Sequence, residues 1–201
     1  MSLLSLTDRL EQVFAELGIP DAEWKEPSLD LENTPGRIAK MLLEELLASY
    51  APGALDALKA RFTCFPSDGE DSMVFEGPID FHSTCAHHLL PFSGQAYIAY
   101  IPGSKLVGAS KLPRVVEHFA RMLQIQERLA RQTAEFIHEE ADAKVVIVLM
   151  SAAHLCMRCR GVKQQNTKMV TTAVRPQPSG EENAAWRGVL NEFYSQLALV
   201  T

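Results

Sequence analysis

The sequence lacks any apolar run long enough to cross a bilayer, which takes about 20 residues. Its longer runs, such as residues 145–150, are far shorter. It also lacks the positive and then apolar beginning of a signal peptide, because the N-terminal residues include Asp8, Glu11 and Glu16. We therefore expect a soluble, cytoplasmic protein with no membrane partner.

Basic residues and cysteines are both scarce. The 19 lysines and arginines are outnumbered by 25 acidic residues, which gives a formal net charge of −6. Nucleic-acid binders usually carry a basic domain or stripe, so we expect no nucleic-acid partner, although a local basic pocket is compatible with this composition.

Four cysteines, Cys64, Cys85, Cys156 and Cys159, are too few for a disulfide framework. We expect reduced thiols or metal ligands, which again indicates the cytoplasm.

What the sequence does contain is 47% hydrophobic residues in helical and strand periodicities, enough for a substantial core. The predicted elements are helices over 5–17 and 34–50, strands over 73–81 and 94–101, helical residues 113–140, strands over 144–150 and 168–175, and a closing helix to about residue 197. Residues 113–140 form two helices or one bent helix. Thr34 is the expected N-cap before Pro35, and Ser179 with Glu182 offers a capping box to the last helix.

This order predicts an α+β fold in which helices cover one face of a sheet. The expected domains are an N-terminal helical region over residues 1–60 and a second domain over residues 61–201.

A thiol and two imidazoles lie within four residues in the stretch STCAHHLLP, residues 83–91, in the connection between two predicted strands. A second stretch, AHLCMRCRG, residues 153–161, follows the third strand. If that strand continues, His154, Cys156 and Arg160 share one face and Cys159 lies on the other.

A catalytic zinc takes three protein ligands and leaves one position open. Cys85, His88 and Cys156 would supply that set and leave His87 and His154 for proton transfer. A closed structural zinc site that adds Cys159 is the alternative, and strand parity argues against it unless the strand ends or bulges near Met157. Buried cysteines and core histidines without a metal are a third interpretation.

Residues 108–114, GASKLPR, open a helix, and helix N-termini bind anions. Lys111 and Arg114, with Arg160 and Lys40, have the charge to hold a triphosphate, although each taken singly is more typical of solvated surface. The Glu127 carboxylate can accept two N–H donors from a guanine edge, while a plain exposed glutamate is the default interpretation.

Between Thr34 and about Thr172 the chain resembles the GTP cyclohydrolase I family, through NTPGRIAKM, STCAHHLLPFSG, AYIPGSKLVGASKLPRVV, QIQERLARQ and AHLCMRCRGV in that order. The resemblance implies a tunnelling fold, an antiparallel sheet backed by two helices in ββααββ order. It also implies a toroidal homodecamer with active sites at subunit interfaces. The implied reaction converts GTP and water to 7,8-dihydroneopterin triphosphate and formate, the first step of pterin and tetrahydrofolate biosynthesis.

Site residues carry over from the resemblance by position. It implies Zn²⁺ ligation by Cys85, His88 and Cys156, and proton transfer by His87 and His154. The remaining implied contacts are with GTP: Glu127 and Gln126 for guanine, and Ser110, Lys111, Arg114, Arg160 and additionally Lys40 for the triphosphate.

The chain departs from the family where Cys-Glu-His-His is usual, because Ala86 replaces the glutamate. A carboxylate there would raise the basicity of His87 or hold its orientation. The threonine-rich strand is thinned to NTKMVTT, and the usual ending is replaced by AVRPQPSGEENAAW. The alternatives are therefore a divergent paralogue that stops at ring opening or uses a related purine or pterin, and a non-catalytic assembly stabilised by structural zinc.

Overall fold

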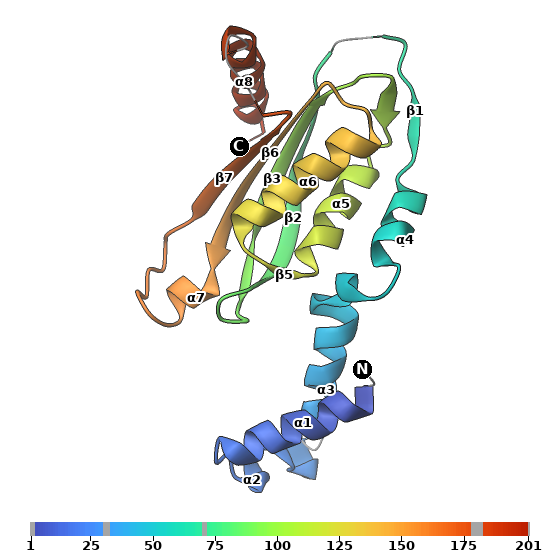
Figure 1. Cartoon of the computed structure of the whole chain (residues 1–201). Coiled ribbons are helices and arrows are strands. Elements are labelled where there is room, and N and C mark those ends of the chain that lie inside the picture. Colours follow the sequence, from blue (N-terminus) through green and yellow to red (C-terminus); the bar gives the residue numbers. More distant parts are fainter. Residues whose placement is uncertain (1–2, 30–32, 70–71, 178–182, 201) are drawn as a thin grey trace. The chain divides into compact units, whose positions relative to one another are not determined.

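The computed structural model describes residues 3–29, 33–69, 72–177 and 183–200. The chain forms two compact units, Met1–Ala48 and Ser49–Thr201. Figure 1 shows their elements coloured along the sequence. None of the described helices is both long and apolar enough to span a membrane.

The first unit is helical. It contains α1 (Leu3–Glu16), α2 (Asp21–Trp24), a short 3-10 turn η1 (Pro27–Leu29), α3 (Thr34–Lys40) and a π-helical segment η2 (Met41–Leu46). Helices α1 and α3 pack together, and the rings of Phe14 and Trp24 meet edge to face. The N-cap prediction is wrong by one position, because α3 begins at Thr34 and Asn33 precedes it. The predicted helix to residue 50 also changes its hydrogen bonding at Met41, where the π-helical segment begins.

The second unit is built on a five-stranded sheet. Its elements are η3 (Ala48–Tyr50), α4 (Ala54–Arg61), β1 (Cys64–Pro66), β2 (Val74–Cys85), β3 (Pro91–Ile101), β4 (Lys105–Val107), α5 (Lys111–Ala120), β5 (Leu123–Gln124), α6 (Gln126–Glu140), β6 (Val145–His154), α7 (Leu155–Arg158), β7 (Met169–Arg175) and α8 (Asn183–Leu197). The strand order is β5-β2-β3-β6-β7, with β1 and β4 paired separately. Strands β2, β3, β6 and β7 are antiparallel, and β5 joins the end of β2 in parallel.

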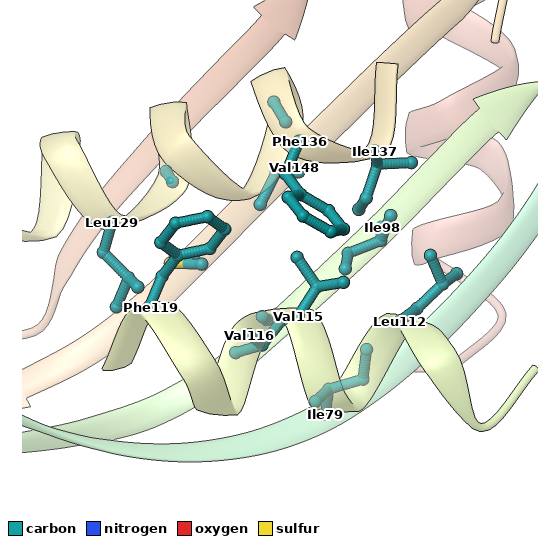
Figure 2. Close-up of a cluster of buried hydrophobic side chains, with 14 of the residues drawn as sticks. Ile79, Ile98, Leu112, Val115, Val116, Phe119, Leu129, Phe136, Ile137 and Val148 are labelled. Carbon is teal, nitrogen blue, oxygen red and sulfur yellow. The ribbon is translucent and has the colours of Figure 1, made fainter. Parts of the chain in front are cut away.

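Helices α5 and α6 cover one face of this sheet (Figure 1). Alternate strand side chains point at them, and Figure 2 shows Ile79, Ile98 and Val148 of the strands beneath apolar side chains of both helices. The larger residues that the two helices contribute to this core are Leu112, Val115, Val116 and Phe119 of α5 and Leu129, Phe136 and Ile137 of α6. The ββααββ arrangement of an α+β domain is therefore confirmed, and residues 113–140 form two helices separated by β5.

The boundary between the units falls at residues 48 and 49, whereas residues 60 and 61 were expected. The reason is α4, whose Leu58 is buried in the core of the second unit. Strand β2 runs to Cys85, four residues beyond its predicted end, because its residues keep pairing with β3 as far as Thr84 opposite Pro91. The closing helix is present, while Ser179 and Glu182 of its predicted capping box lie outside the described residues.

Helix α8 packs on part of the opposite sheet face, through the buried Phe193 and the partly buried Val189, Leu190 and Leu197. Phe193 is fully buried, and its ring lies 5.7 Å from that of Phe75. The cluster around it contains Tyr97, Ala99, Ile147 and Leu149.

We expect Phe193→Ala to lower the free energy of unfolding by about 3 to 5 kcal/mol, because it empties a buried aromatic site. Urea titration of the full chain measures this loss. The matched control is Tyr194→Ala on the exposed side of the same helix, with an expected cost of about 1 kcal/mol or less. Equal losses in the two variants would show that Phe193 does not anchor α8.

Candidate metal centre and surrounding site

Three metal-ligating side chains meet at one end of the sheet. Cys85 ends β2, His88 lies in the turn that follows, and Cys156 lies in α7. One ligand atom from each falls within 4.8 Å of the others, and the two sulfurs are 3.9 Å apart. Cys85 is buried, Cys156 is partly buried and His88 is exposed. The group is therefore supported from inside the fold and reachable from solvent.

The turn between β2 and β3 has a fixed backbone. The N–H of Cys85 donates to Leu90 O (2.9 Å), and the N–H of Leu89 donates back to Cys85 O (2.9 Å). Leu89 adopts a left-handed conformation with φ 55°, which closes the turn. The N–H of Ala86 donates to Gln124 O of β5 (2.8 Å). The position of His87 and His88 is thus set by main-chain hydrogen bonds.

Strand β5 is held in turn by a polar network. The Gln124 side chain is fully buried; its Nε2 donates to Phe119 O (2.9 Å) and to Gln132 Oε1 (2.8 Å). Arg128 Nε donates to Gln124 Oε1 (2.9 Å), and Arg128 also contacts the Leu123 carbonyl. Sequence analysis missed this network, because one glutamine between two helices carries no pattern that marks it as buried.

His87 is exposed beside the metal-ligating group without belonging to it. Its Nδ1 lies 3.8 Å from Cys85 Sγ. Its imidazole is therefore available to a molecule that approaches the group from solvent.

His154 is the last residue of β6 and is 8% exposed. Its ring stacks on Phe92, the residue opposite it on β3, with centroids 4.5 Å apart and planes 4° from parallel. Its Nε2 lies 2.9 Å from Gln126 Oε1. Burial lowers the pKa of His154, and the nearby Glu127 carboxylate acts in the opposite direction. The unprotonated imidazole is thus the favoured form near neutral pH.

The strand does not continue through residues 154–160, because β6 ends at His154 and the chain turns into α7. The N–H of Cys159 donates to Leu155 O (2.9 Å), as in a helical turn, so strand parity does not apply. Cys159 is exposed, its Sγ contacts Leu155 O at 3.0 Å, and it lies outside the metal-ligating group found among the described residues. Burial, followed by the neighbouring Cys85 thiol, raises the pKa of Cys156, and the charge of Arg160 opposes this rise.

The two residues predicted to contact guanine differ in exposure. The side chain of Gln126 is fully buried, and its amide is hydrogen-bonded within the chain. Glu127 is exposed and lines a surface pocket of about 380 Å³ with Arg131 and residues of β7. Only the Glu127 carboxylate therefore faces open space.

The predicted phosphate contacts are not gathered in one place. Ser110 precedes α5, and Lys111 and Arg114 lie in its first turn. The C-terminal end of α5 is the one near the metal-ligating group. Ala120 O accepts a hydrogen bond from Ser83 Oγ (2.7 Å), and Ser83 lies two residues before Cys85 on β2. At 1.5 Å per residue, the length of α5 separates the two ends by roughly 13 Å.

The other two predicted cations belong to different units of the chain. Arg160 is exposed and close enough to Cys156 to act on its pKa. Lys40 is exposed at the end of α3 and belongs to the first unit.

The fold and the ligand group together define an α+β protein with a Cys-His-Cys group that could hold a metal ion. A comparison with known families is more specific: the family model described as GTP cyclohydrolase I matches residues 16–190. The chain belongs to the GTP cyclohydrolase I family.

Similar proteins carry the family name. A Campylobacter jejuni subsp. doylei protein named GTP cyclohydrolase 1 is 46% identical over 145 residues, which is 72% of this chain and 74% of that one. A Pseudomonas syringae pv. tomato protein named GTP cyclohydrolase 1 2 is 43% identical over 167 residues, 82% and 86% of the two chains. Among solved structures, the archaeosine synthase QueF-Like in the apo form gives a TM-score of 0.43 at 13% identity, over 54% of this chain and 95% of that one.

Proposed function

We propose that this chain is a zinc-dependent GTP cyclohydrolase I that converts GTP and water to 7,8-dihydroneopterin triphosphate and formate. The observation that carries the proposal is the meeting of Cys85, His88 and Cys156, with His87 and His154 on the same end of the sheet, in a chain of this family.

The donor set fits Zn²⁺ in chemistry and in size. Zinc prefers thiolate and imidazole ligands, and a tetrahedral ion with Zn–S bonds of about 2.3 Å places two sulfurs roughly 3.8 Å apart. The observed separation of Cys85 and Cys156 is 3.9 Å. Three protein ligands leave one position for water, which is the arrangement of catalytic sites. When bound, zinc supplies a water that is acidic enough to lose a proton near neutral pH.

The chain's own residues bind and orient GTP and move protons. The Glu127 carboxylate accepts two N–H donors from the guanine edge and so sets the orientation of the base. His154, whose resting imidazole is unprotonated, first takes up a proton and then donates it to N7 beside the carbon that leaves as formate, and His87 serves the later sugar rearrangement and ring closure. Ser110, Lys111, Arg114 and Arg160 hold the triphosphate, with Lys40 as a further contact.

We also propose that the site is completed by another copy of the chain in a homodecamer. Support comes from the length of α5, which separates Lys111 and Arg114 from the metal-ligating group of the same chain. A neighbouring copy would bring its own α5 to the triphosphate. Strand β7 lies at the edge of the sheet and has no partner strand on its outer side within the described part of the chain, so this edge could pair with another copy.

The cellular location we propose is the cytoplasm. The four cysteines are all free thiols, which suits a reducing compartment.

A single assay tests the reaction. Purified protein with a measured zinc content is incubated with GTP, and both formate and the fluorescent, oxidised neopterin are quantified. We expect both products in equal amounts, with about one zinc per chain. The absence of both products would overturn the proposal, and it would favour another purine or pterin as substrate, or a structural metal.

One observation favours a second outcome. Ala86 is exposed beside His87, so no carboxylate at that position supports this imidazole. A paralogue that opens the ring without rebuilding it would release formate and no neopterin. The same assay therefore distinguishes the complete reaction from ring opening alone.

A further inference from the structure

The amide of Gln126 has an orientation that its partners determine. Its Nε2 lies 3.0 Å from Met150 O, 2.9 Å from Met169 O and 3.2 Å from Thr171 Oγ1. Carbonyl oxygens can only accept hydrogen bonds, so the NH2 end of the amide must face them. The reversed amide would set its oxygen against two carbonyl oxygens.

This orientation decides which nitrogen of His154 carries a proton. Gln126 Oε1 lies 2.9 Å from His154 Nε2, and an amide oxygen can only accept. His154 Nε2 must therefore be an N–H. In a neutral imidazole the other nitrogen, Nδ1, then holds the lone pair.

The same contacts fix the ring in space. Phe92 stacks on the imidazole and sets its plane, while Gln126 restrains rotation within that plane. Gln126 is itself tied to β6 through Met150 and to β7 through Met169. The Gln126 side chain is completely buried, and its Nε2 donors are all directed at groups of the chain itself.

We infer that Gln126 is a positioning residue for His154. It holds the imidazole as the Nε2–H tautomer and leaves Nδ1 as the nitrogen that exchanges a proton with the substrate. The role of Nδ1 in proton exchange rests on the proposed function, whereas the Nε2–H tautomer does not. Metal-bound histidines are fixed in the same way by partners of their second nitrogen, and loss of such a partner typically costs 10- to 100-fold.

The tautomer can be measured without turnover. Solid-state ¹⁵N NMR of histidine-labelled wild-type protein distinguishes protonated from unprotonated ring nitrogens, and the spectrum of His154→Asn identifies the His154 signals. At a pH about two units above the usual imidazole pKa of about 6.5, we expect a protonated Nε2 and an unprotonated Nδ1. An unprotonated Nε2 would overturn the inference whatever the substrate is. This measurement also needs no variant with a mutated Gln126 to fold.

A kinetic experiment tests whether the positioning of His154 by Gln126 contributes to catalysis. Gln126→Met keeps the length of the side chain and removes both amide groups, so we expect kcat to fall about 10- to 100-fold, with KM changed by less than about threefold. Thr171→Val is the matched control, because it removes one partner of Nε2 and leaves the bond to His154 intact. Its kcat should stay within about threefold of wild type.

The outcomes separate this inference from the proposed function. An expected tautomer with unchanged kcat in Gln126→Met would overturn the role of Gln126 in catalysis and leave the GTP reaction standing. Absence of any GTP turnover in the wild-type protein would refute the proposed function, while the NMR spectrum would still decide the tautomer.

Discussion

Replacing Cys156 with serine should remove the bound metal and the turnover of GTP together. Serine cannot supply the thiolate that zinc prefers, and the two remaining ligands, Cys85 and His88, are too few for a stable tetrahedral site. Without an activated water, we expect turnover to fall about 10³-fold or more. Zinc per chain is measured by elemental analysis on the same samples used for the assay. Full activity in a zinc-free Cys156→Ser protein would refute the metal assignment.

Cys159→Ser is the matched control, three residues away in the same turn. The Cys159 thiol is exposed and donates to the Leu155 carbonyl, a bond that a serine hydroxyl can also make. We expect unchanged zinc content and turnover. Loss of zinc here would favour the closed Cys3His site, in which the metal is structural.

Replacing Glu127 with glutamine should weaken the binding of GTP and spare the metal. The exposed carboxylate offers two acceptors to the guanine edge, whereas an amide sets one of its N–H donors against an N–H of the base. A lost hydrogen bond to a charged group costs about 1.5 to 3 kcal/mol, which corresponds to a roughly 10- to 150-fold loss of affinity. The rise in KM for GTP measures this loss.

Inosine triphosphate makes this experiment more specific, because its base lacks the exocyclic amine. Wild-type protein should prefer GTP over the inosine nucleotide in kcat/KM, and Glu127→Gln should bring the two values close together. Glu139→Gln removes the same charge from the far end of α6 and should keep the wild-type preference. An unchanged preference in Glu127→Gln would place the guanine elsewhere.

Local patterns in the sequence predict much of this fold. The apolar periodicity of residues 113–140 indicates helix, and Val115 and Phe136 do face the sheet. The β-branched and aromatic runs indicate the main strands. The residue types of Cys85, His88 and Cys156 likewise predict one metal site without any knowledge of their contacts.

Features that depend on distant contacts could not be predicted. Strand β5 has only two residues and exists because it pairs with the end of β2. Strand β6 ends at His154 and α7 follows, so the alternation of strand side chains does not extend to Cys159. The stacking of His154 on Phe92 requires the register of β3 and β6, which the sequence does not encode in a local pattern.

The phosphate contacts show a different limit. Lys111 and Arg160 have the right charge, but sequence spacing says nothing about whether residues of one chain or of two share a ligand. The length of α5 is what separates them here.

The backbone of the turn between β2 and β3 has a thermodynamic consequence for the metal. In zinc fingers the free energy of metal binding is also the free energy of folding, so a chelator unfolds them. Here hydrogen bonds from Cys85, Ala86 and Leu89 hold the ligand-bearing backbone in place, and none of these bonds uses a metal-ligating atom. A metal ion at this site would therefore bind beside a turn that is already ordered, which limits the conformational entropy lost on binding. If zinc binds at this site, we expect it to add stability to a chain that already folds without it, so that the apoprotein stays folded and regains activity when zinc returns.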